Sequence, residues 1–433
     1  MRIDRLRLSN FRCFEERELA FPERFSVLIG ENGAGKTTLI EALAILLGNF
    51  VLGIDRVGAK APGIENDQVR RSVREIDGVV TEEARYPTRV EADGRLPGET
   101  GGSRWGRERE RDRPTTRNNR LLLLARTFTD DVRAGRELVL PLLAAYRVDP
   151  PAKAPKSAAV LDMALGSRLD GYVGCLDGVV DTASLSRWFA QRQGAELQER
   201  NGAPADLAAV RRALADALPL CRHVRFSFQH VQLFVGDGGG ALMPFHQLSD
   251  GYRRMFALVA DLARRAAVLN PQLGADAVSQ TPGVVLIDEL DLHLHPRWQR
   301  EVVGALKRAF PCLQFIATTH SPFIIQSLRP GELVRLEGEP AYPYADESVE
   351  DILEDVMGIA LPQRSRRLER LRELTAEYQR LLAAGETVEA GRAAKVQDEL
   401  DDLMARFASD DASAALYAFL ERKRLAAGLA ARP

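Results

Sequence analysis

The chain has 433 residues, with 59 basic and 61 acidic side chains and a hydrophobic fraction of 45%. This length exceeds what one hydrophobic core usually holds, so we expect one large domain with an inserted or appended lobe, or two domains. The hydrophobic fraction is sufficient for a packed core. The net charge of −2 gives no argument for nucleic acid, although it leaves a local basic patch open.

The sequence also disfavours a secreted or membrane protein. Four scattered cysteines form no CxxC pair, which argues against a disulfide framework or zinc ribbon and suits reduced thiols. The first residues lack the apolar run of a signal peptide, and no stretch approaches the roughly 20 apolar residues of a membrane span. We therefore expect a cytoplasmic protein without a membrane partner.

A phosphate-binding loop is predicted between a strand and a helix. Residues 25–30, FSVLIG, have the pattern of a buried strand, and the helix begins at Thr37. In the intervening GENGAGKTT, glycines let successive N–H groups point at a phosphate in front of the helix N-terminus. In this pattern Lys36 reaches the β- and γ-phosphates, and the Thr37 hydroxyl ligates Mg²⁺. The residues predicted to bind ATP here are Gly30, Asn32, Gly33, Gly35, Lys36, Thr37 and Thr38.

The segment from about 51 to 220 is predicted to be a helical or irregular insertion. Pro87, Pro97 and Pro114, with the arginine-rich stretch 94–120, predict turns and an exposed basic loop. That loop is either a solvated surface or an electrostatic contact with nucleic acid. Residues 183–218 have helical patterning, and two short strands, VRFSF and VQLFV, follow before the glycine-rich turn 236–240.

Beyond residue 283 the pattern of strand, helix and strand implies a parallel sheet. The buried strand VVLID ends at Asp288, which is placed to hold Mg²⁺ directly or through water. Glu289 can polarise the water that attacks the γ-phosphate. The strand QFIATTH ends at His320, which would face the ligand crevice and contact the γ-phosphate or the attacking water.

Two shorter patterns complete the set. LSDGYRR stands directly before a long apolar helix, with Ser249 and Gly251 at its start. His293 and His295, with Asp291, admit either a zinc site or a structural or subunit-contact role. No further cysteine or histidine cluster supports the zinc alternative.

The order of these motifs resembles that of the ABC-type ATPases, specifically their RecF- and SMC-like branch. The start IDRLRLSNFRCFEERELAFPERFSVLIGENGAGKTTLIEALA is similar to the amino-terminal half of that family's head, and LSDGYRRMFALVADLARR to its signature motif. The resemblance covers residues 1–50 and 222–335 well and the middle loosely. It implies an α/β P-loop head with a mixed or parallel sheet over 1–335, including a helical lobe, and a helical C-terminal region over 336–433.

The resemblance further implies a head-to-head homodimer that sandwiches two ATP molecules, with higher oligomers also open. Ser249 and Gly251 would contact the γ-phosphate held by the partner, and the signature helix would point its N-terminus at that charge. A glutamine that contacts Mg²⁺ and the attacking water usually follows the first helix, and Gln68 is the candidate. ATP would hold the dimer together and hydrolysis would release it.

Departures from the family narrow the biological role. The insertion lacks the long heptad arms of SMC proteins, and the last hundred residues lack the strand-borne Asp-x-Asp of a TOPRIM nuclease. The tail YPYADESVEDILEDVMGI, 342–359, resembles stand-alone bacterial ATPases. Those include components of anti-phage systems such as Septu and some retrons, in which a separate nuclease is the effector.

We therefore expect an ATPase that acts as a switch on DNA or on a DNA-directed partner, in anti-phage defence or DNA repair, through an effector such as a nuclease. One alternative is the nucleotide-binding subunit of a membrane transporter, which the SNFRCFEE start and the helical tail fit poorly. Another is an ATP-bound sensor or inhibitor with little turnover. Asp250 bears on the second alternative, because a carboxylate pointing inward would repel the γ-phosphate.

Overall fold

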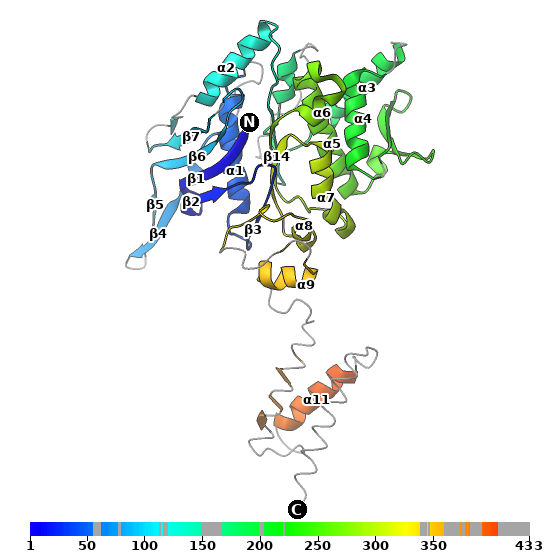
Figure 1. Ribbon diagram of the computed structural model, residues 1–433. Helices are drawn as coiled ribbons and strands as arrows, with labels where there is room; N and C mark the ends of the chain where they lie inside the picture. The colour runs from blue at the N-terminus through cyan, green and yellow to red at the C-terminus, as the bar shows by residue number, and fades with distance from the viewer. Residues whose placement is uncertain are drawn as a thin grey trace, which may run out of the picture. The chain divides into compact units, whose positions relative to one another are not determined.

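The computed structural model describes residues 1–54, 62–76, 79–99, 101–111, 114–115, 120–148, 167–198, 203–219, 221–337, 344, 347–358, 370, 373–374, 377–378, 380–381 and 392–405. The chain divides into two compact units, Met1–Ile352 and Leu353–Pro433, which are described separately (Figure 1). The first unit holds every residue that the sequence predicts to bind or hydrolyse ATP.

A five-stranded parallel sheet forms the centre of the first unit. Its strand order is β15-β3-β14-β13-β9, and every neighbouring pair is parallel. The strands are β15 (Leu333–Arg335), β3 (Phe25–Ile29), β14 (Leu313–Thr318), β13 (Gly283–Ile287) and β9 (Leu142–Tyr146). The last four are buried throughout, as in sheets covered on both faces. Because the strands are parallel, their carboxyl ends meet at one edge of the sheet.

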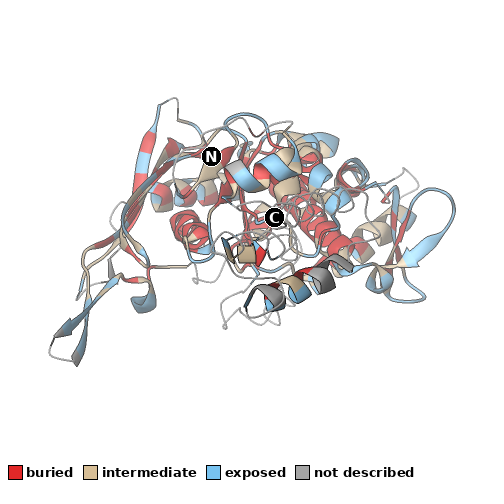
Figure 2. Ribbon diagram, turned by 90° about the horizontal axis from the view of Figure 1, so that it is seen from below, coloured by how far each residue is buried: buried red, intermediate tan, exposed pale blue. Residues whose placement is uncertain are grey.

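Helix α1 (Lys36–Val51) packs between this sheet and a second, antiparallel one (Figure 1). The second sheet has the order β2-β1-β6-β7-β8. Its strands are β1 (Arg2–Phe11), β2 (Phe14–Ala20), β6 (Thr88–Arg95), β7 (Ser103–Arg109) and β8 (Pro114–Thr115). Every residue of α1 except Thr37 is buried, and Figure 2 colours the buried positions red. The helix therefore opens to solvent only in its first turn.

The structure corrects the prediction of an exposed basic loop within 94–120. Residues 103–109 form β7, which pairs with β6, and a separate hairpin consists of β4 (Arg71–Ile76) and β5 (Val79–Ala84). Trp105 is fully buried, and Arg107 is 7% exposed because its guanidinium binds Asn49 Oδ1 at 2.6 Å and the Pro62 carbonyl. A buried arginine at an inward position hides the apolar alternation by which a strand is recognised. The predicted helical or irregular insertion thus also contains strands.

The predicted helical patterning of 183–218 and the two predicted short strands after it are confirmed, and a third strand, β12 (Leu242–Pro244), follows the glycine-rich turn. They form a lobe that packs against the signature helix α5, which begins at Asp250 as the sequence indicated. The lobe and its neighbours comprise α2 (Arg120–Arg133), α3 (Thr182–Gln198), α4 (Ala205–Ala217), β10 (His223–Ser227), β11 (Gln232–Gly236), β12 (Leu242–Pro244), α5 (Asp250–Leu269) and α6 (Ala277–Gln280).

The remaining elements extend the first unit beyond the predicted head boundary at 335. Helices α7 (Pro296–Ala309), α8 (Pro322–Gln326) and α9 (Val349–Asp351) follow the signature helix along the chain. Tyr344 donates its hydroxyl to the Arg329 carbonyl at 3.0 Å, and Gln326 Nε2 donates to the Glu347 carbonyl at 2.7 Å. These bonds attach residues 344 and 347 to the head. The predicted α/β fold, a parallel sheet with covering helices and a phosphate-loop connection, is confirmed.

The second unit contains the helix α11 (Arg392–Ala405). Leu374, Val396 and Leu400 form a small buried cluster within this unit, against which Tyr378 and Leu381 pack. Spacing of four residues places Val396 and Leu400 on the same face of α11. The described part of this unit therefore has an apolar contact that orders the helix against its own preceding segment.

Candidate nucleotide-binding site

The glycine loop connects the end of β3 to the start of α1. Gly33 and Gly35 have φ angles of 89° and 94°, a region that side chains disfavour. A Cβ on Gly35 would also lie 2.5 Å from Phe14 Cζ and 2.9 Å from Cys13 Sγ. Glycine is therefore required at 35 for both the backbone angle and the available space. The loop enters α1 without any side-chain cap, so the helix N-terminus stays available to an anion.

Lys36 folds back over the loop. Its Nζ donates to the carbonyl oxygens of Gly30 and Glu31, both at 2.8 Å. Burial lowers the pKa of Lys36, and the carboxylates of Asp288 and Glu289 oppose that shift. The loop after β3 and the acids after β13 lie at the same carboxyl edge of the sheet, with β14 between the two strands. Next to it, Thr37 is exposed and Thr38 is buried.

Asp288 and Glu289 follow β13 and are held by the neighbouring strands. Asp288 is 3% exposed, and its Oδ1 accepts a hydrogen bond of 2.6 Å from the Thr318 hydroxyl at the end of β14. The same hydroxyl oxygen accepts from the Glu289 N–H at 2.7 Å, while the Asp288 N–H donates to the Tyr146 carbonyl at 2.8 Å. Glu289 has a φ of 50°, an uncommon value for a residue with a side chain. The ends of three strands therefore determine where the two carboxylates lie.

Asp291 organises the segment around His320. Its Oδ1 accepts from the Thr319 hydroxyl at 2.6 Å and from the His320 N–H at 3.2 Å. His320 is exposed at the sheet edge, two residues past β14. The sequence suggested Asp291 only as a zinc ligand beside His293 and His295, whereas in the structure its carboxylate binds the hydroxyl and backbone N–H that follow β14.

The signature segment reaches this edge through α5. Ser249 is exposed and caps the helix by accepting from the Tyr252 N–H at 3.4 Å. Asp250 forms an ion pair with Arg253 one turn later. Gly251 is buried, and a Cβ there would overlap the carbonyl oxygen of His293. Glycine at 251 is therefore already required by packing within one chain.

Arg254 connects the signature helix to the end of β13. Its Nη2 donates to the carbonyl oxygens of Asp288 and Glu289 at 3.2 and 3.4 Å. Burial lowers the pKa of Arg254, and the carboxylates of Glu289, Asp291 and Asp288 oppose that shift. The start of α5 therefore packs directly against residues 288–291, which we call the acidic segment.

Glu41, which the sequence analysis missed, connects Gln68 to the first helix. The Glu41 carboxylate, one turn after Thr37, forms ion pairs with Arg12 at 2.7 Å and with Arg147. Gln68 donates from Nε2 to Glu41 Oε2 at 3.5 Å, and its Oε1 accepts from the Glu65 N–H at 3.0 Å. Gln68 therefore lies against the helix that carries Thr37.

Arg147 could have been identified from the sequence as a candidate site residue, because it directly follows the buried strand LLAAY. Residues at the carboxyl ends of parallel strands face the ligand crevice. The side chains of Tyr146 and Arg147 reach different partners: Tyr146 donates to Asp261 Oδ2 of α5 at 2.9 Å, whereas Arg147 pairs with Glu41 of α1. The end of β9 thereby connects the loop helix to the signature helix.

Asp261 lies at the centre of a second buried charge cluster. It is 2% exposed and pairs with Arg264 at 2.6 Å and Arg265 at 2.7 Å. Arg265 also donates to the carbonyls of Gly171 and Val173 at 2.8 and 2.9 Å. Burial by itself would raise the pKa of Asp261, but the two arginines outweigh it and hold that pKa well below its usual range.

Metal-binding side-chain clusters and membrane-spanning helices are both absent from the described residues. These residues hold no group of three or more His, Cys, Asp or Glu side chains arranged to bind a metal ion. His295 accepts from the Arg297 N–H through Nδ1 at 3.3 Å, as the N-cap of α7. Among the helices of the described chain, none has both the length and the apolarity for crossing a bilayer.

A family model described as "AAA domain, putative AbiEii toxin, Type IV TA system" matches residues 25–326, which is more than half of the chain. The chain belongs to this family. The match extends from β3 to α8 and so includes the glycine loop, the signature helix and the acidic segment of this AAA domain.

Several named proteins are similar in sequence to this AAA-domain protein. Two are named probable ATPases of retrons: Vc95 of Vibrio cholerae, 40% identical over 27% of this chain and 22% of that protein, and Ec83 of Escherichia coli, 22% identical over 76% and 70%. The Septu protein PtuA of Bacillus mycoides is 48% identical over 22% and 13%. The chain therefore spans only a fraction of the Vibrio and Bacillus proteins.

The predicted RecF-like resemblance is confirmed over part of the chain. The DNA replication and repair protein RecF of Oceanobacillus iheyensis is 46% identical over 11% of this chain and 12% of that protein. Among solved structures, the SMC head domain from Thermotoga maritima covers 76% of this chain and 92% of its own, with a TM-score of 0.39 and 14% identity.

Proposed function

We propose that this protein binds ATP with Mg²⁺ and hydrolyses it at the carboxyl edge of the parallel sheet. The observation that carries the proposal is the parallel strand order β3-β14-β13, which brings the Lys36 loop after β3 and the acids Asp288 and Glu289 after β13 to the same edge of the sheet. A lysine, a helix N-terminus and two carboxylates at one edge match the needs of phosphoryl transfer to water.

The phosphates would bind the loop and the start of α1. Lys36 would exchange its two carbonyl partners for the β- and γ-phosphate oxygens, which attract an ammonium more strongly. N–H groups of the loop and first turn would hold the phosphates from the other side. The residues in this role are Gly30, Asn32, Gly33, Gly35, Lys36, Thr37 and Thr38.

The side chains present suit Mg²⁺, which prefers oxygen ligands. Thr37 presents an exposed hydroxyl, and Asp288 Oδ2 accepts no hydrogen bond from a described residue. These two groups would hold the ion, with Gln68 as a further contact from the segment beside Glu41. When bound, Mg²⁺ neutralises phosphate charge.

Hydrolysis would depend on Glu289 and His320. Glu289 would accept the proton of the attacking water, and the Thr318 hydroxyl holds its backbone in place for that role. His320 would contact the γ-phosphate or the same water, with its backbone N–H bound to Asp291. Glu289 and His320 follow β13 and β14, which are neighbouring strands of the sheet.

The site would be completed by a second copy of the chain. Ser249 is exposed at the start of α5, where its hydroxyl and the helix N-terminus can meet an anion from outside. Gly251 is buried against His293, so its contribution would be through its backbone. Arg253 pairs with Asp250, so the Asp250 carboxylate would repel a partner's phosphate less.

For the biological role, we propose a switch in anti-phage defence or DNA repair that controls a separate effector such as a nuclease. The names of the retron, Septu and RecF relatives support this choice. In this proposal the ATPase head comprises the predicted residues 1–335, with the insertion at about 51–220, together with the attached segment up to Ile352, and the remainder of the predicted 336–433 region is available to partners. The protein would act in the cytoplasm.

Glu289→Gln tests hydrolysis and dimerisation together. The amide cannot accept the proton of water, so kcat should fall by about 10²- to 10⁴-fold while ATP binding persists. Light scattering should then show a dimer with ATP and a monomer without it. The matched control is Glu301→Gln on the exposed face of α7. This variant should keep the wild-type kcat and the wild-type dependence of dimerisation on ATP.

The outcomes separate the alternatives. A Glu289→Gln variant that stays monomeric with ATP would exclude the dimer switch. Slow wild-type turnover that the substitution leaves unchanged would favour an ATP-bound sensor. Lys36→Ala should abolish nucleotide binding in either case, and retained binding would exclude the assigned loop.

A further inference from the structure

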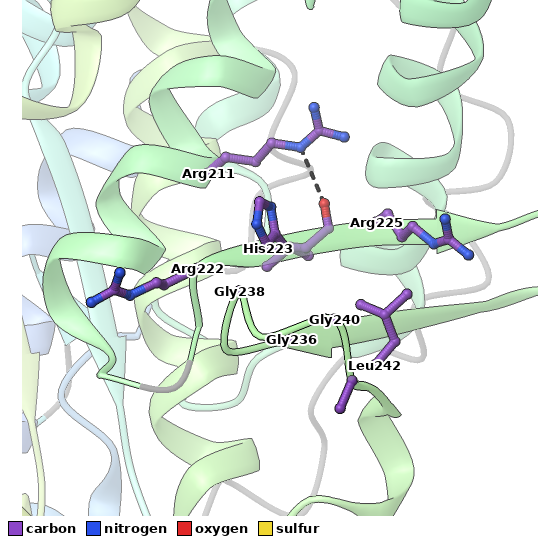
Figure 3. A pocket seen from close by; sticks show the side chains of 10 residues that line it. Arg211, Arg222, His223, Arg225, Gly236, Gly238, Gly240 and Leu242 are labelled. Atoms are coloured by element: carbon purple, nitrogen blue, oxygen red, sulfur yellow. Dashed lines mark hydrogen bonds between the residues drawn. The ribbon is translucent and has the colours of Figure 1, made fainter.

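A basic pocket lies outside the nucleotide site, on the small sheet formed by β10, β11 and β12 (Figure 3). It has a volume of about 420 Å³ and lies between β10 and the turn 236–241. The basic residues that line it are Arg211, Arg222, His223 and Arg225. None of these residues takes part in the proposed ATP chemistry.

The turn opposite these side chains has an accessible backbone. Gly238 and Gly240 have φ angles of 91° and 96°. A Cβ on Gly238 would lie 3.3 Å from Arg222 Cδ, so the turn passes close to that cation, whereas one on Gly240 would meet nothing within 4 Å. Asp237 accepts from the Gly239 N–H at 2.8 Å, but no described residue accepts from the N–H of Gly238 or Gly240. Open N–H groups in glycine turns are suited to anions.

The pocket arginines differ in their state of pairing. Arg211 is occupied, since it donates to the Val224 carbonyl at 3.1 Å and pairs with Glu196 at 2.8 Å. Arg222 and Arg225 are exposed, and within the described chain their guanidinium groups have no hydrogen-bonding or ionic partner. Unpaired arginines beside a glycine turn offer forked donors that match phosphate oxygens.

The positions of the charges favour a chain of phosphates over a single one. Figure 3 shows the side chains of Arg222 and Arg225 pointing towards opposite ends of the hairpin. Phe234 is the cross-strand partner of Arg225, is partly exposed, and lies next to the ring of His230 at 5.7 Å. Leu242, paired with Gly236 on the next strand, is 37% exposed. Spaced cations beside an aromatic and an apolar side chain are the features that bind single-stranded nucleic acid.

From these observations we infer that the outer face of the β10–β12 sheet binds the phosphate backbone of single-stranded nucleic acid, with Arg222 and Arg225 as its main contacts. The inference deepens the proposed function and rests on it for a DNA-related role. Because the pocket is separate from Lys36 and Glu289, binding there should not require hydrolysis.

The test compares Arg222→Glu/Arg225→Glu with the wild-type full-length chain. Fluorescence anisotropy would follow a labelled oligothymidylate of about 16 nucleotides between about 50 and 200 mM salt. The variant should bind at least about tenfold more weakly, and the slope of log K against log salt should fall by about 1.4, or about 0.7 per lost phosphate contact. Arg308→Glu/Arg329→Glu, which changes two exposed arginines elsewhere, should retain both values.

Several results would overturn the inference. These are a wild-type chain that does not bind the oligonucleotide, equal weakening in both double variants, or equal competition by polyglutamate and by unlabelled oligonucleotide. Tighter binding to a duplex of the same length would contradict the single-strand assignment. ATP turnover of the wild-type chain, measured on each preparation, tests the proposed function separately. Absence of turnover together with intact oligonucleotide binding would contradict only the ATPase proposal.

Discussion

Asp261 and Glu41 are both buried carboxylates held by two arginines, but their partners come from different parts of the chain. Asp261 pairs with Arg264 and Arg265, three and four residues later on the same helix. At these separations side chains lie on one face of a helix, so the sequence spacing alone predicts the contact. The ion pairs of this cluster are therefore local, while its hydrogen bonds with Tyr146, Gly171 and Val173 attach α5 to distant segments.

The Glu41 cluster joins segments that are distant in sequence. Its partners are Arg12 after β1, Gln68 in a short turn and Arg147 after β9. Arg12 retains 35% exposure of its side chain, against 6% for Arg265. Glu41 also lies one turn beyond the phosphate loop. Loss of Asp261 is therefore expected mainly to destabilise the fold, whereas loss of Glu41 is expected to disturb the segments around the phosphate loop.

The largest expected effect is on stability, from Asp261→Ala. This change leaves Arg265 buried without its carboxylate, and breaking such a pair costs about 3–5 kcal/mol. Urea unfolding would measure the loss. The double variant Asp261→Leu/Arg265→Met removes both charges and should be much closer to wild type. If the single and double variants are equally unstable, packing rather than the unpaired charge explains the loss.

Glu41→Gln should have a smaller effect on stability and a larger one on nucleotide binding. The amide preserves the shape but loses the charge, so we expect a loss of about 1–2 kcal/mol in the free energy of unfolding. Affinity for a fluorescent ATP analogue should also change, because the helix carrying Lys36 and Thr37 loses its connections. Asp261→Asn, measured at a temperature where it is folded, is the control. If affinity for the ATP analogue changed in Asp261→Asn and not in Glu41→Gln, the proposed link between Glu41 and the nucleotide site would be wrong.

The smallest expected effect is a difference in acid sensitivity. The pKa of Asp261 is lowered by folding, so its stabilisation is present above the unfolded pKa of about 3.9 and is lost as pH falls below that value. Unfolding free energy below about pH 4 should therefore fall more steeply in wild type than in Asp261→Asn, by at most about 1.4 kcal/mol per pH unit. Parallel profiles would contradict a charged Asp261 in the folded state.

Much of the candidate nucleotide site at the carboxyl edge of the parallel sheet was predictable, because the sequence patterns that indicate it are local. The glycine loop, the apolar strand before Asp288 and the start of α5 after Ser249 each depend on a few adjacent residues. A repeated order of strand and helix also predicts a parallel sheet, whose carboxyl ends then meet at one edge. The contact between Gly251 and the His293 carbonyl was not predictable, since nothing nearby in sequence indicates it.

The sequence by itself determined the α/β class, the phosphate loop and the residues after each buried strand, because backbone angles and apolar periodicity are short-range properties. For the arginines on or beside strands, only the tertiary structure decided which are paired. In β7, Arg104 pairs with Asp93 and Arg107 is buried against Asn49, whereas Arg222 and Arg225 remain exposed beside a glycine turn. An arginine's partner depends on which distant strand lies across from it, and the composition of its own segment does not contain that information.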